Sequence, residues 1–250
     1  MLAVTLTGGP TALLELGGAR LLVDPTFDPP GDHPVGDRVL TKTGGPALPA
    51  PGLLPVDAVL LSHDQHPDNL DVAGRALLAD VPLVLTTEVA AGRLGGTARA
   101  LSTGETVAVG DVQVTAVPAR HGPPGAEALA GPVTGFVLAG EGLPTVYVSG
   151  DNAALECVDD VAAAFPRIDV AVLFAGAART ALFDRAPLTL TATDAAEAVR
   201  RLGSPRVVLV HVDQWAHFSE DRDDVVRALT AAGLADRLVD TPPGVRVGLS

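Results

Sequence analysis

The first 25 residues alternate short apolar runs with glycine-containing turns. The runs cover residues 3–7, 11–16 and 20–23. Gly8-Gly9-Pro10 and Gly17-Gly18 separate them, and Asp24-Pro25 follows the third run. Short apolar runs joined by glycine turns are typical of an antiparallel β-meander. We therefore predict three antiparallel strands at the start of the chain.

The segment 26–55 lacks a regular hydrophobic pattern and is rich in proline and glycine. This composition predicts a long surface loop. We expect His33, which lies inside the segment, to be exposed to solvent.

Beyond residue 55, apolar runs of strand length alternate with amphipathic segments of helical length. Strands are predicted over 56–61, 81–85, 105–109, 112–117, 134–138, 145–149, 170–174, 206–210 and 245–248. Helices are predicted over 70–78, 87–93, 153–165, 191–202 and 219–232. Strands and helices that alternate after an antiparallel start predict mixed α/β sheets covered by helices. No linker divides the pattern, so we predict a single domain over residues 1–250.

The composition indicates an aliphatic core and argues against polyanionic partners. Hydrophobic residues make up 47% of the 250 residues, but aromatic residues only 3%. A net charge of −13 offers no electrostatic attraction to nucleic acid or to an anionic membrane surface. Lys42 is the only lysine, so arginine supplies almost all of the positive charge.

Cysteine content and hydropathy point to the cytoplasm. The single cysteine, Cys157, excludes an intrachain disulfide, and we expect it to pack within a helix. We see no signal peptide and no apolar run of about 20 residues. We therefore expect a cytoplasmic protein that does not enter the membrane, and the sequence leaves a homo-oligomer open.

The densest group of metal-binding residue types lies between His63 and Asp71. Two histidines and three aspartates fall within this stretch, between a predicted buried strand and a predicted helix. Ligand sites are expected at such strand-to-helix turns. The alternative is a polar loop in which Asp68 or Asn69 caps the following helix.

Three later predicted strands also lead into metal-binding residue types, namely His121, Asp151 and His211. Imidazole and carboxylate together suit zinc, manganese or iron, and three protein ligands leave an open position for water. The full set is large enough for two ions. For any single histidine, the alternative is an ordinary hydrogen-bonded side chain. The roles of His217 and Asp24 stay open between a part in the site and a structural part.

In the order of these groups the chain resembles the hydrolases of the metallo-β-lactamase fold, in particular the branch that contains ascorbate-6-phosphate lactonase. The stretch Ser62–Asp71 occupies the position of that family's His-x-His-x-Asp-His hallmark. His121, Asp151 and His211 follow in the order of its three distant ligands. The resemblance spans the whole chain. It implies a four-layer αβ/βα sandwich, in which helices flank two mixed sheets.

The resemblance also implies a role for each site residue. The metal ligands would be His63, His66, Asp68, His121, Asp151 and His211. Of these, the three histidines His63, His66 and His121 would hold a first ion, which Asp151 would bridge or complete. A metal-bound hydroxide would be the nucleophile. Asp68 would be a second-site ligand or the general base, so Asp68 and Asp151 are the expected catalytic residues.

The sequence departs from the hallmark at two positions. Two residues, rather than one, separate His63 from His66, and an alternative register would make Asp64 a ligand. Asn69 stands where the hallmark has its last histidine, and an amide oxygen is a poorer ligand than imidazole. We therefore expect one or two ions, with weak or absent occupancy of the second site.

The function predicted from the sequence is a metal-dependent hydrolase that acts on a small-molecule ester, lactone or phosphoester. Zinc is the expected ion, with manganese and iron as alternatives. Three other interpretations stay open: a non-hydrolytic metal-binding or ligand-sensing protein on the same fold, a phosphodiesterase or nuclease, and an oxidoreductase with a di-iron centre. The acidic charge disfavours a polynucleotide substrate.

Overall fold

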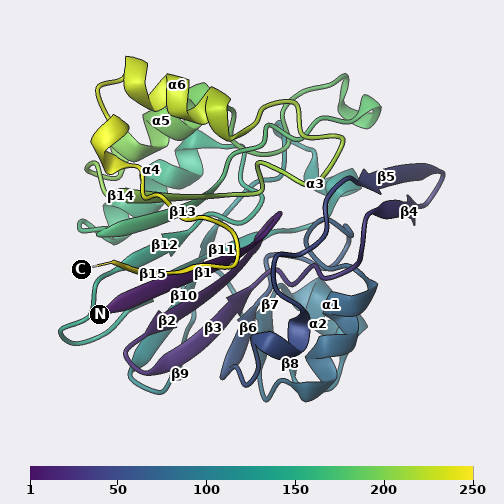
Figure 1. The fold of residues 1–250 in the computed structure, drawn as a ribbon, viewed down its shortest axis with the longest axis horizontal. Helices are drawn as coiled ribbons and strands as arrows, with labels where there is room; N and C mark the ends of the chain where they lie inside the picture. The colour runs from purple at the N-terminus through teal and green to yellow at the C-terminus, as the bar shows by residue number, and fades with distance from the viewer. Residues whose placement is uncertain (250) are drawn as a thin grey trace.

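The computed structural model describes residues 1–249, in which two large β-sheets pack face to face with helices on their outer sides (Figure 1). In spatial order, the first sheet contains β15 (Arg246–Leu249), β1 (Leu2–Gly8), β2 (Thr11–Leu16), β3 (Ala19–Val23), β6 (Ala58–Leu60), β7 (Val84–Thr86) and β8 (Ala98–Ala100). Its strands are antiparallel from β15 to β3 and parallel from β3 to β8.

The second sheet is mixed in the same way. In spatial order it contains β14 (Arg206–Val210), β13 (Val170–Phe174), β12 (Val146–Val148), β11 (Thr134–Ala139), β10 (Val112–Pro118) and β9 (Thr106–Val109). The first three are parallel to one another, and β11, β10 and β9 are joined by antiparallel pairing. The ends of β10, β12 and β14 deliver the three later site residues.

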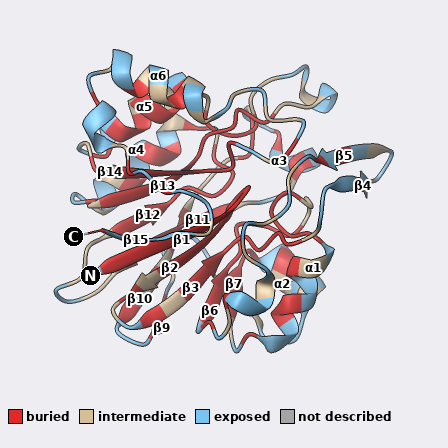
Figure 2. Cartoon of the chain, in the orientation of Figure 1, coloured by how far each residue is buried: buried red, intermediate tan, exposed pale blue. Residues whose placement is uncertain are grey.

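Aliphatic side chains fill three hydrophobic layers. The central layer lies between the two sheets and takes alternate residues of their strands, such as Leu2 and Val4 from β1 and Val112 and Val114 from β10. The outer layers cover the other faces of the sheets, and the buried strands stand out in Figure 2. This arrangement confirms the predicted four-layer sandwich of two mixed sheets.

The helices are short and lie outside the sheets. They are α1 (Val72–Leu77), α2 (Glu88–Leu94), α3 (Glu127–Ala130), α4 (Leu155–Ala164), α5 (Ala192–Arg201) and α6 (Arg222–Ala231). Single 3-10 turns cover Ala50–Gly52, Leu78–Asp80, Ala181–Phe183 and Ala235–Arg237. Helices α4, α5 and α6 cover the second sheet, and Cys157 is buried there in α4, as expected. Among the described residues, no helix is both long and apolar enough to cross a bilayer.

The prediction of a long surface loop over 26–55 was wrong for residues 31–42, because these residues form a two-stranded hairpin. Its strands are β4 (Gly31–Val35) and β5 (Arg38–Lys42), which project from the body of the molecule (Figure 1). His33 is correspondingly less exposed than expected. Its side chain is 13% exposed, and its ring lies 5.2 Å from that of Trp215.

The residue that caps α1 also differs from both predicted caps. Asp71, rather than Asp68 or Asn69, accepts the hydrogen bond from the backbone N–H of Gly74 at 2.8 Å. Its other carboxylate oxygen lies 2.9 Å from Nζ of Lys42, and both side chains are fully buried. Asp71 therefore carries the capping function, and it also ties β5 to the start of α1.

Candidate metal centre

Three imidazoles from both sheets meet in one cluster. His63 and His66 follow β6 in the first sheet, and His121 follows β10 in the second. One nitrogen from each lies within 4.8 Å of the others, and Nε2 of His63 is 3.0 Å from Nδ1 of His66. Two nitrogen ligands of one tetrahedral ion lie about 3.4 Å apart. The cluster therefore has the dimensions of a metal site.

Neighbouring groups fix the orientation of two of these imidazoles. Nδ1 of His121 lies 2.8 Å from the carbonyl oxygen of Leu188, to which it donates. Nδ1 of His63 is 2.9 Å from Oγ of Ser62, and that hydroxyl donates to Asp24 at 2.6 Å. The opposite nitrogen of each ring is thereby left for the cluster, as is usual for metal-binding histidines. Asp24 acts through Ser62 and not by direct contact with an imidazole.

A second cluster combines two carboxylates with an imidazole. Donor atoms of Asp68, Asp151 and His211 lie within 4.8 Å of one another, and all three residues are buried. Nε2 of His211 is 3.3 Å from Asp68 and 3.5 Å from Asp151. One carboxylate oxygen of each aspartate is buried without a hydrogen-bond donor. Unpaired buried carboxylate oxygens are costly, and a cation would compensate them. The residues present therefore fit a divalent metal ion.

The local electrostatics match the needs of metal ligands. Burial, together with the neighbouring imidazoles, lowers the pKa of His63 well below its usual value and that of His66 to about 4. Both rings are therefore neutral near pH 7, with lone pairs available. Burial alone would raise the pKa of Asp68, but the charges of His217 and His211 and their hydrogen bonds hold it well below the usual value. Asp68 is therefore a carboxylate.

Asn69 acts as a hydrogen-bond donor between two buried carboxylates. Its Nδ2 lies 3.0 Å from Oδ2 of Asp24 and 3.0 Å from Oδ1 of Asp151. Burial raises the pKa of Asp24 to about 7, against the hydrogen bonds from Ser62 and Asn69. Asn69 therefore orients Asp151, and the second cluster has one imidazole fewer than the hallmark would supply.

Asp64 faces away from both clusters. It forms ion pairs with Arg93 and, at 3.5 Å, with Arg75, while its side chain is only 2% exposed. The register with Asp64 as a ligand is therefore not the one that the chain adopts. The inserted residue instead directs Asp64 towards α1 and α2.

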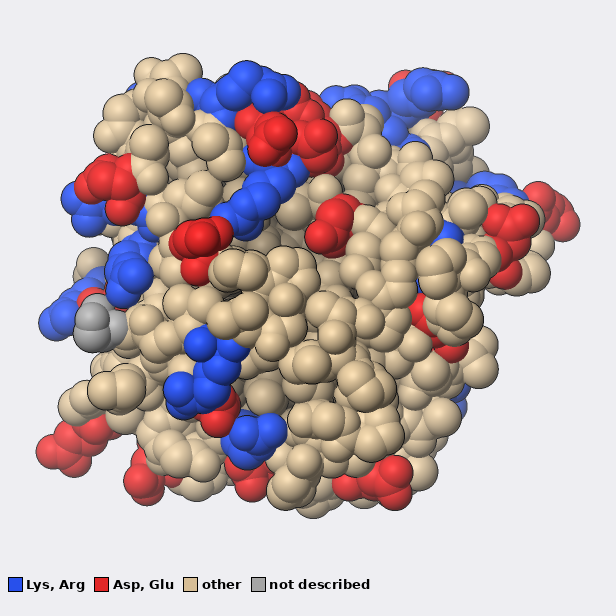
Figure 3. Space-filling model, in the orientation of Figure 1, with Lys and Arg blue, Asp and Glu red and all other residues tan. Residues whose placement is uncertain are grey.

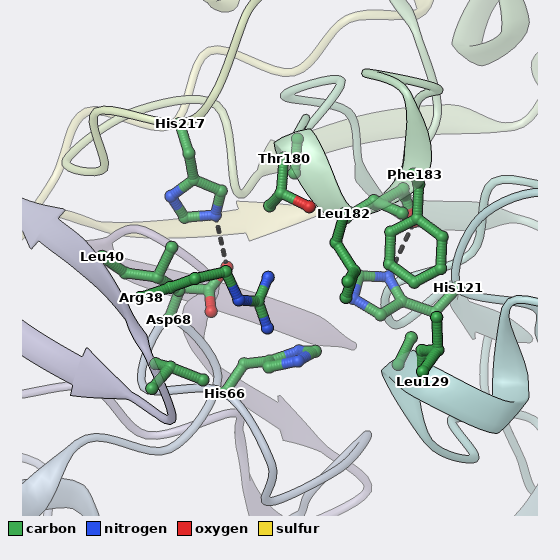
Figure 4. A pocket seen from close by; sticks show the side chains of 14 residues that line it. Arg38, Leu40, His66, Asp68, His121, Leu129, Thr180, Leu182, Phe183 and His217 are labelled. Carbon is green, nitrogen blue, oxygen red and sulfur yellow. Dashed lines mark hydrogen bonds and ion pairs between the residues drawn. The ribbon is translucent and has the colours of Figure 1, made fainter.

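The sequence left the role of His217 open, and the structure places this residue beside the second cluster. Its Nε2 is 2.9 Å from Oδ2 of Asp68. Arg38 escaped sequence reasoning, since nothing distinguishes it from other arginines until the hairpin folds. Figure 4 shows both side chains projecting into the pocket that opens above the centre, together with His66, Asp68 and His121.

Three further arginines, Arg120, Arg179 and Arg185, do not line the pocket, and two of them are held by other contacts. Arg120 forms an ion pair with Glu156 at 2.5 Å. Arg179 donates to the carbonyl oxygen of Arg185 at 2.6 Å and to Oγ of Ser219 at 3.0 Å.

Residues 19–212 match the family model described as the beta-lactamase superfamily domain. The chain belongs to this superfamily. Two relatives of the chain are named UPF0173 metal-dependent hydrolases. The one from Pyrobaculum arsenaticum is 30% identical over 243 residues, which are 93% of this chain and 94% of the relative. The one from Pyrobaculum aerophilum is 28% identical over 240 residues, with the same two shares.

Comparison with solved structures shows the same fold. An isothiocyanate hydrolase from Delia radicum gut bacteria aligns with a TM-score of 0.85 at 23% identity, covering 99% of each chain. These findings confirm the predicted fold and the prediction of a metal-dependent hydrolase. The narrower resemblance to the ascorbate-6-phosphate lactonase branch stays a prediction.

Proposed function

We propose that this superfamily member hydrolyses a carboxylic ester or lactone of a small molecule, with a divalent ion held by the residues described above. The observation that carries the proposal is the position of the two ligand clusters at the base of a pocket with mainly apolar walls. Apolar walls with a few convergent polar groups are typical of sites for small organic molecules.

His63, His66 and His121 would hold the ion, and Asp151 lies between this triad and the second cluster. Its Oδ2 is 3.7 Å from Nδ1 of His121, and its Oδ1 is 3.5 Å from Nε2 of His211. Three imidazoles and a carboxylate favour zinc, with manganese or iron as alternatives. When bound, the ion would act as a Lewis acid that lowers the pKa of water and polarises the scissile carbonyl.

Asp68 is the proposed general base. Its carboxylate is deprotonated, buried and directed into the pocket (Figure 4). It is placed to accept a proton from an attacking water molecule. His217 contacts the same carboxylate and also lines the pocket, so it is placed to pass that proton towards the leaving group.

A matched set of variants tests this proposal. Zinc-reconstituted protein is assayed with chromogenic esters, lactones and phosphodiesters, beside His121→Ala, Asp68→Asn and Arg179→Gln. We expect ester or lactone hydrolysis that chelation abolishes and that the first two variants lower by at least about 100-fold. Arg179→Gln, whose side chain lies outside the pocket, is expected to retain the activity. Hydrolysis that survives both chelation and His121→Ala would remove the proposal.

A second candidate reaction is hydrolysis of an isothiocyanate, the activity in the name of the structural relative from Delia radicum gut bacteria. The apolar wall formed by Leu129, Leu182 and Phe183 favours it, because an isothiocyanate presents little besides an apolar body and one electrophilic carbon. Adding benzyl isothiocyanate to the same assay compares the two candidates.

A polynucleotide substrate is disfavoured. The chain carries a net charge of −13, and on the face shown in Figure 3 the basic side chains are interspersed with acidic ones. Such a surface provides no continuous basic track for a phosphate backbone.

A further inference from the structure

One permanently charged side chain lines the pocket above the metal centre. Arg38 opens β5 opposite Val35, and Figure 4 shows its guanidinium between Asp68 and the imidazoles of His66 and His121. Its charge is close enough to contribute to the lowered pKa of His66. Among the described residues, no carboxylate lies within ion-pair distance of Arg38. The guanidinium therefore keeps its donors for a ligand.

The hairpin that carries Arg38 is held in place by buried contacts. Lys42, at the end of β5, pairs with Asp71 at 2.9 Å and lies 5.7 Å from the ring centre of Trp215. The backbone N–H of Thr43 donates to Gln214 at 2.7 Å. These contacts fix β5 against the segment that also carries His217. Arg38 is thereby positioned over the metal centre rather than free in solvent.

The rest of the pocket mouth is apolar. Leu129 from α3 and Leu182 from the turn Ala181–Phe183 line it, although they are 64% and 42% exposed. Leu40, Phe183 and Leu188 extend the same wall. Large exposed apolar side chains around a polar centre indicate contact with an apolar ligand group.

We propose that the substrate carries a carboxylate, which Arg38 binds, and an apolar body that lies against Leu129 and Leu182. This inference deepens the proposed function and rests on it. The planar guanidinium fork matches a carboxylate through two parallel hydrogen bonds. Among the described residues, Arg38 is the only arginine or lysine that lines the pocket, so the lining matches a monoanion better than a phosphate dianion.

The test compares two ligands of equal size that differ in charge. Zinc-reconstituted protein is titrated calorimetrically with 4-phenylbutanoate and with its neutral amide, 4-phenylbutanamide. Arg38→Gln is the test variant and Arg179→Gln the control, because Arg179 follows Ala178 of the pocket lining but has its guanidinium bonded elsewhere. Arg38 makes no ion pair with any residue that the structure describes, so the test variant is expected to fold, which its thermal midpoint checks.

We expect the wild-type protein and Arg179→Gln to prefer the carboxylate. Arg38→Gln is expected to lower that preference by about tenfold or more, with little change in affinity for the amide. If Arg38→Gln and the wild type preferred the carboxylate over the amide to the same degree, the inference would be overturned. The metal ion alone would then account for binding of the carboxylate. Absence of a preference in the wild type would overturn the inference as well.

A kinetic pair separates this inference from the proposed function. The mono-4-nitrophenyl ester of glutaric acid and 4-nitrophenyl pentanoate differ mainly in the terminal carboxylate. If neither ester is turned over but the binding preference depends on Arg38, the proposed ester hydrolysis fails and the carboxylate site stands. If both esters are hydrolysed and the KM of each ester is the same for the wild type and for Arg38→Gln, the proposed hydrolysis stands and the inference fails.

Discussion

The side-chain amide of Asn69 bridges two carboxylates at the position where the superfamily hallmark has a histidine. It donates to Asp24 and Asp151, both at 3.0 Å, so its nitrogen rather than its oxygen faces the centre. The three imidazoles of the first cluster are intact, whereas the second cluster depends on Asp68, Asp151 and His211. The affinity for metal is therefore expected to be uneven between the two.

This asymmetry predicts one tightly held ion per chain. Freshly purified protein, desalted and analysed by plasma mass spectrometry, should contain about one equivalent of divalent metal. His121→Ala should lose that ion because it removes a ligand from the triad, whereas Arg179→Gln should keep it. Two ions that survive desalting in the wild type would show that the second cluster binds without the missing imidazole.

Protonation of His66 predicts a pH-dependent stability of the metal-free protein. The pKa of His66 is lowered from 6.5 to about 4 by burial and by His121. Below pH 6.5 the unfolded chain binds a proton that the folded chain does not, so stability is lost as the pH falls towards 4. The loss through His66 is about 3 kcal/mol over this range. Asp24 acts oppositely, because its pKa is raised to about 7 and its contribution is lost as the pH rises through that value.

A comparison of the wild type with His66→Asn isolates the contribution of His66. Both proteins keep Asp24, so the contribution of Asp24 cancels in the difference between them. Urea denaturation of chelator-treated protein at pH 7.5 and pH 5 gives the unfolding free energy of both proteins. Between pH 7.5 and pH 5, the change in unfolding free energy is expected to be about 2 kcal/mol more favourable in the variant than in the wild type, because the variant lacks the destabilising protonation of His66. Equal changes in the two proteins would contradict the assigned pKa.

The packing of α1 against the end of β3 depends on a glycine. A Cβ atom on Gly74 would lie 1.8 Å from the carbonyl oxygen of Pro25, which is a backbone atom that cannot turn aside. Gly92, in α2, has no atom within 4 Å of the same position. The two glycines therefore differ in packing although both lie inside short helices.

This difference predicts opposite effects of the same substitution. Gly74→Ala should destabilise the protein by at least about 2 kcal/mol, because α1 must move away from Pro25. Gly92→Ala should stabilise it by about 0.5–1 kcal/mol, the usual effect of removing a helical glycine. Urea denaturation measures both. Stabilisation by Gly74→Ala would show that α1 lies farther from Pro25 than it does in the structure.

At the scale of the whole molecule, the candidate metal centre joins the two sheets. His63 and His66 come from the first sheet, and His121, Asp151 and His211 follow strands of the second. An ion bound by both groups stabilises the folded state, because the separated segments of an unfolded chain bind it weakly.

Removal of the metal is therefore expected to lower the thermal midpoint by several degrees, in one transition that involves both sheets. Calorimetry with and without chelator measures the shift, and His121→Ala should show a much smaller one. A single transition would also support the predicted single domain over residues 1–250. Two separate transitions would contradict that prediction.

The sequence determined the layer architecture and predicted which residues gather at the candidate metal centre. Strand-length apolar runs predicted most of the strands, with the runs over 170–174 and 206–210 matching β13 and β14 residue for residue. The hallmark and the later strand ends named all six residues of the two clusters. Hydrophobic period and local turn chemistry are short-range properties, so they can be read along the chain.

Only the tertiary structure decided the contacts between residues far apart in the chain. The hairpin β4–β5 was missed because most of its residues face solvent, and its position depends on the buried pair of Lys42 with Asp71. The contact of His217 with Asp68, 149 residues away, and the entry of Arg38 into the pocket likewise follow from packing. No local pattern encodes such long-range pairings, because they arise when the two sheets close on each other.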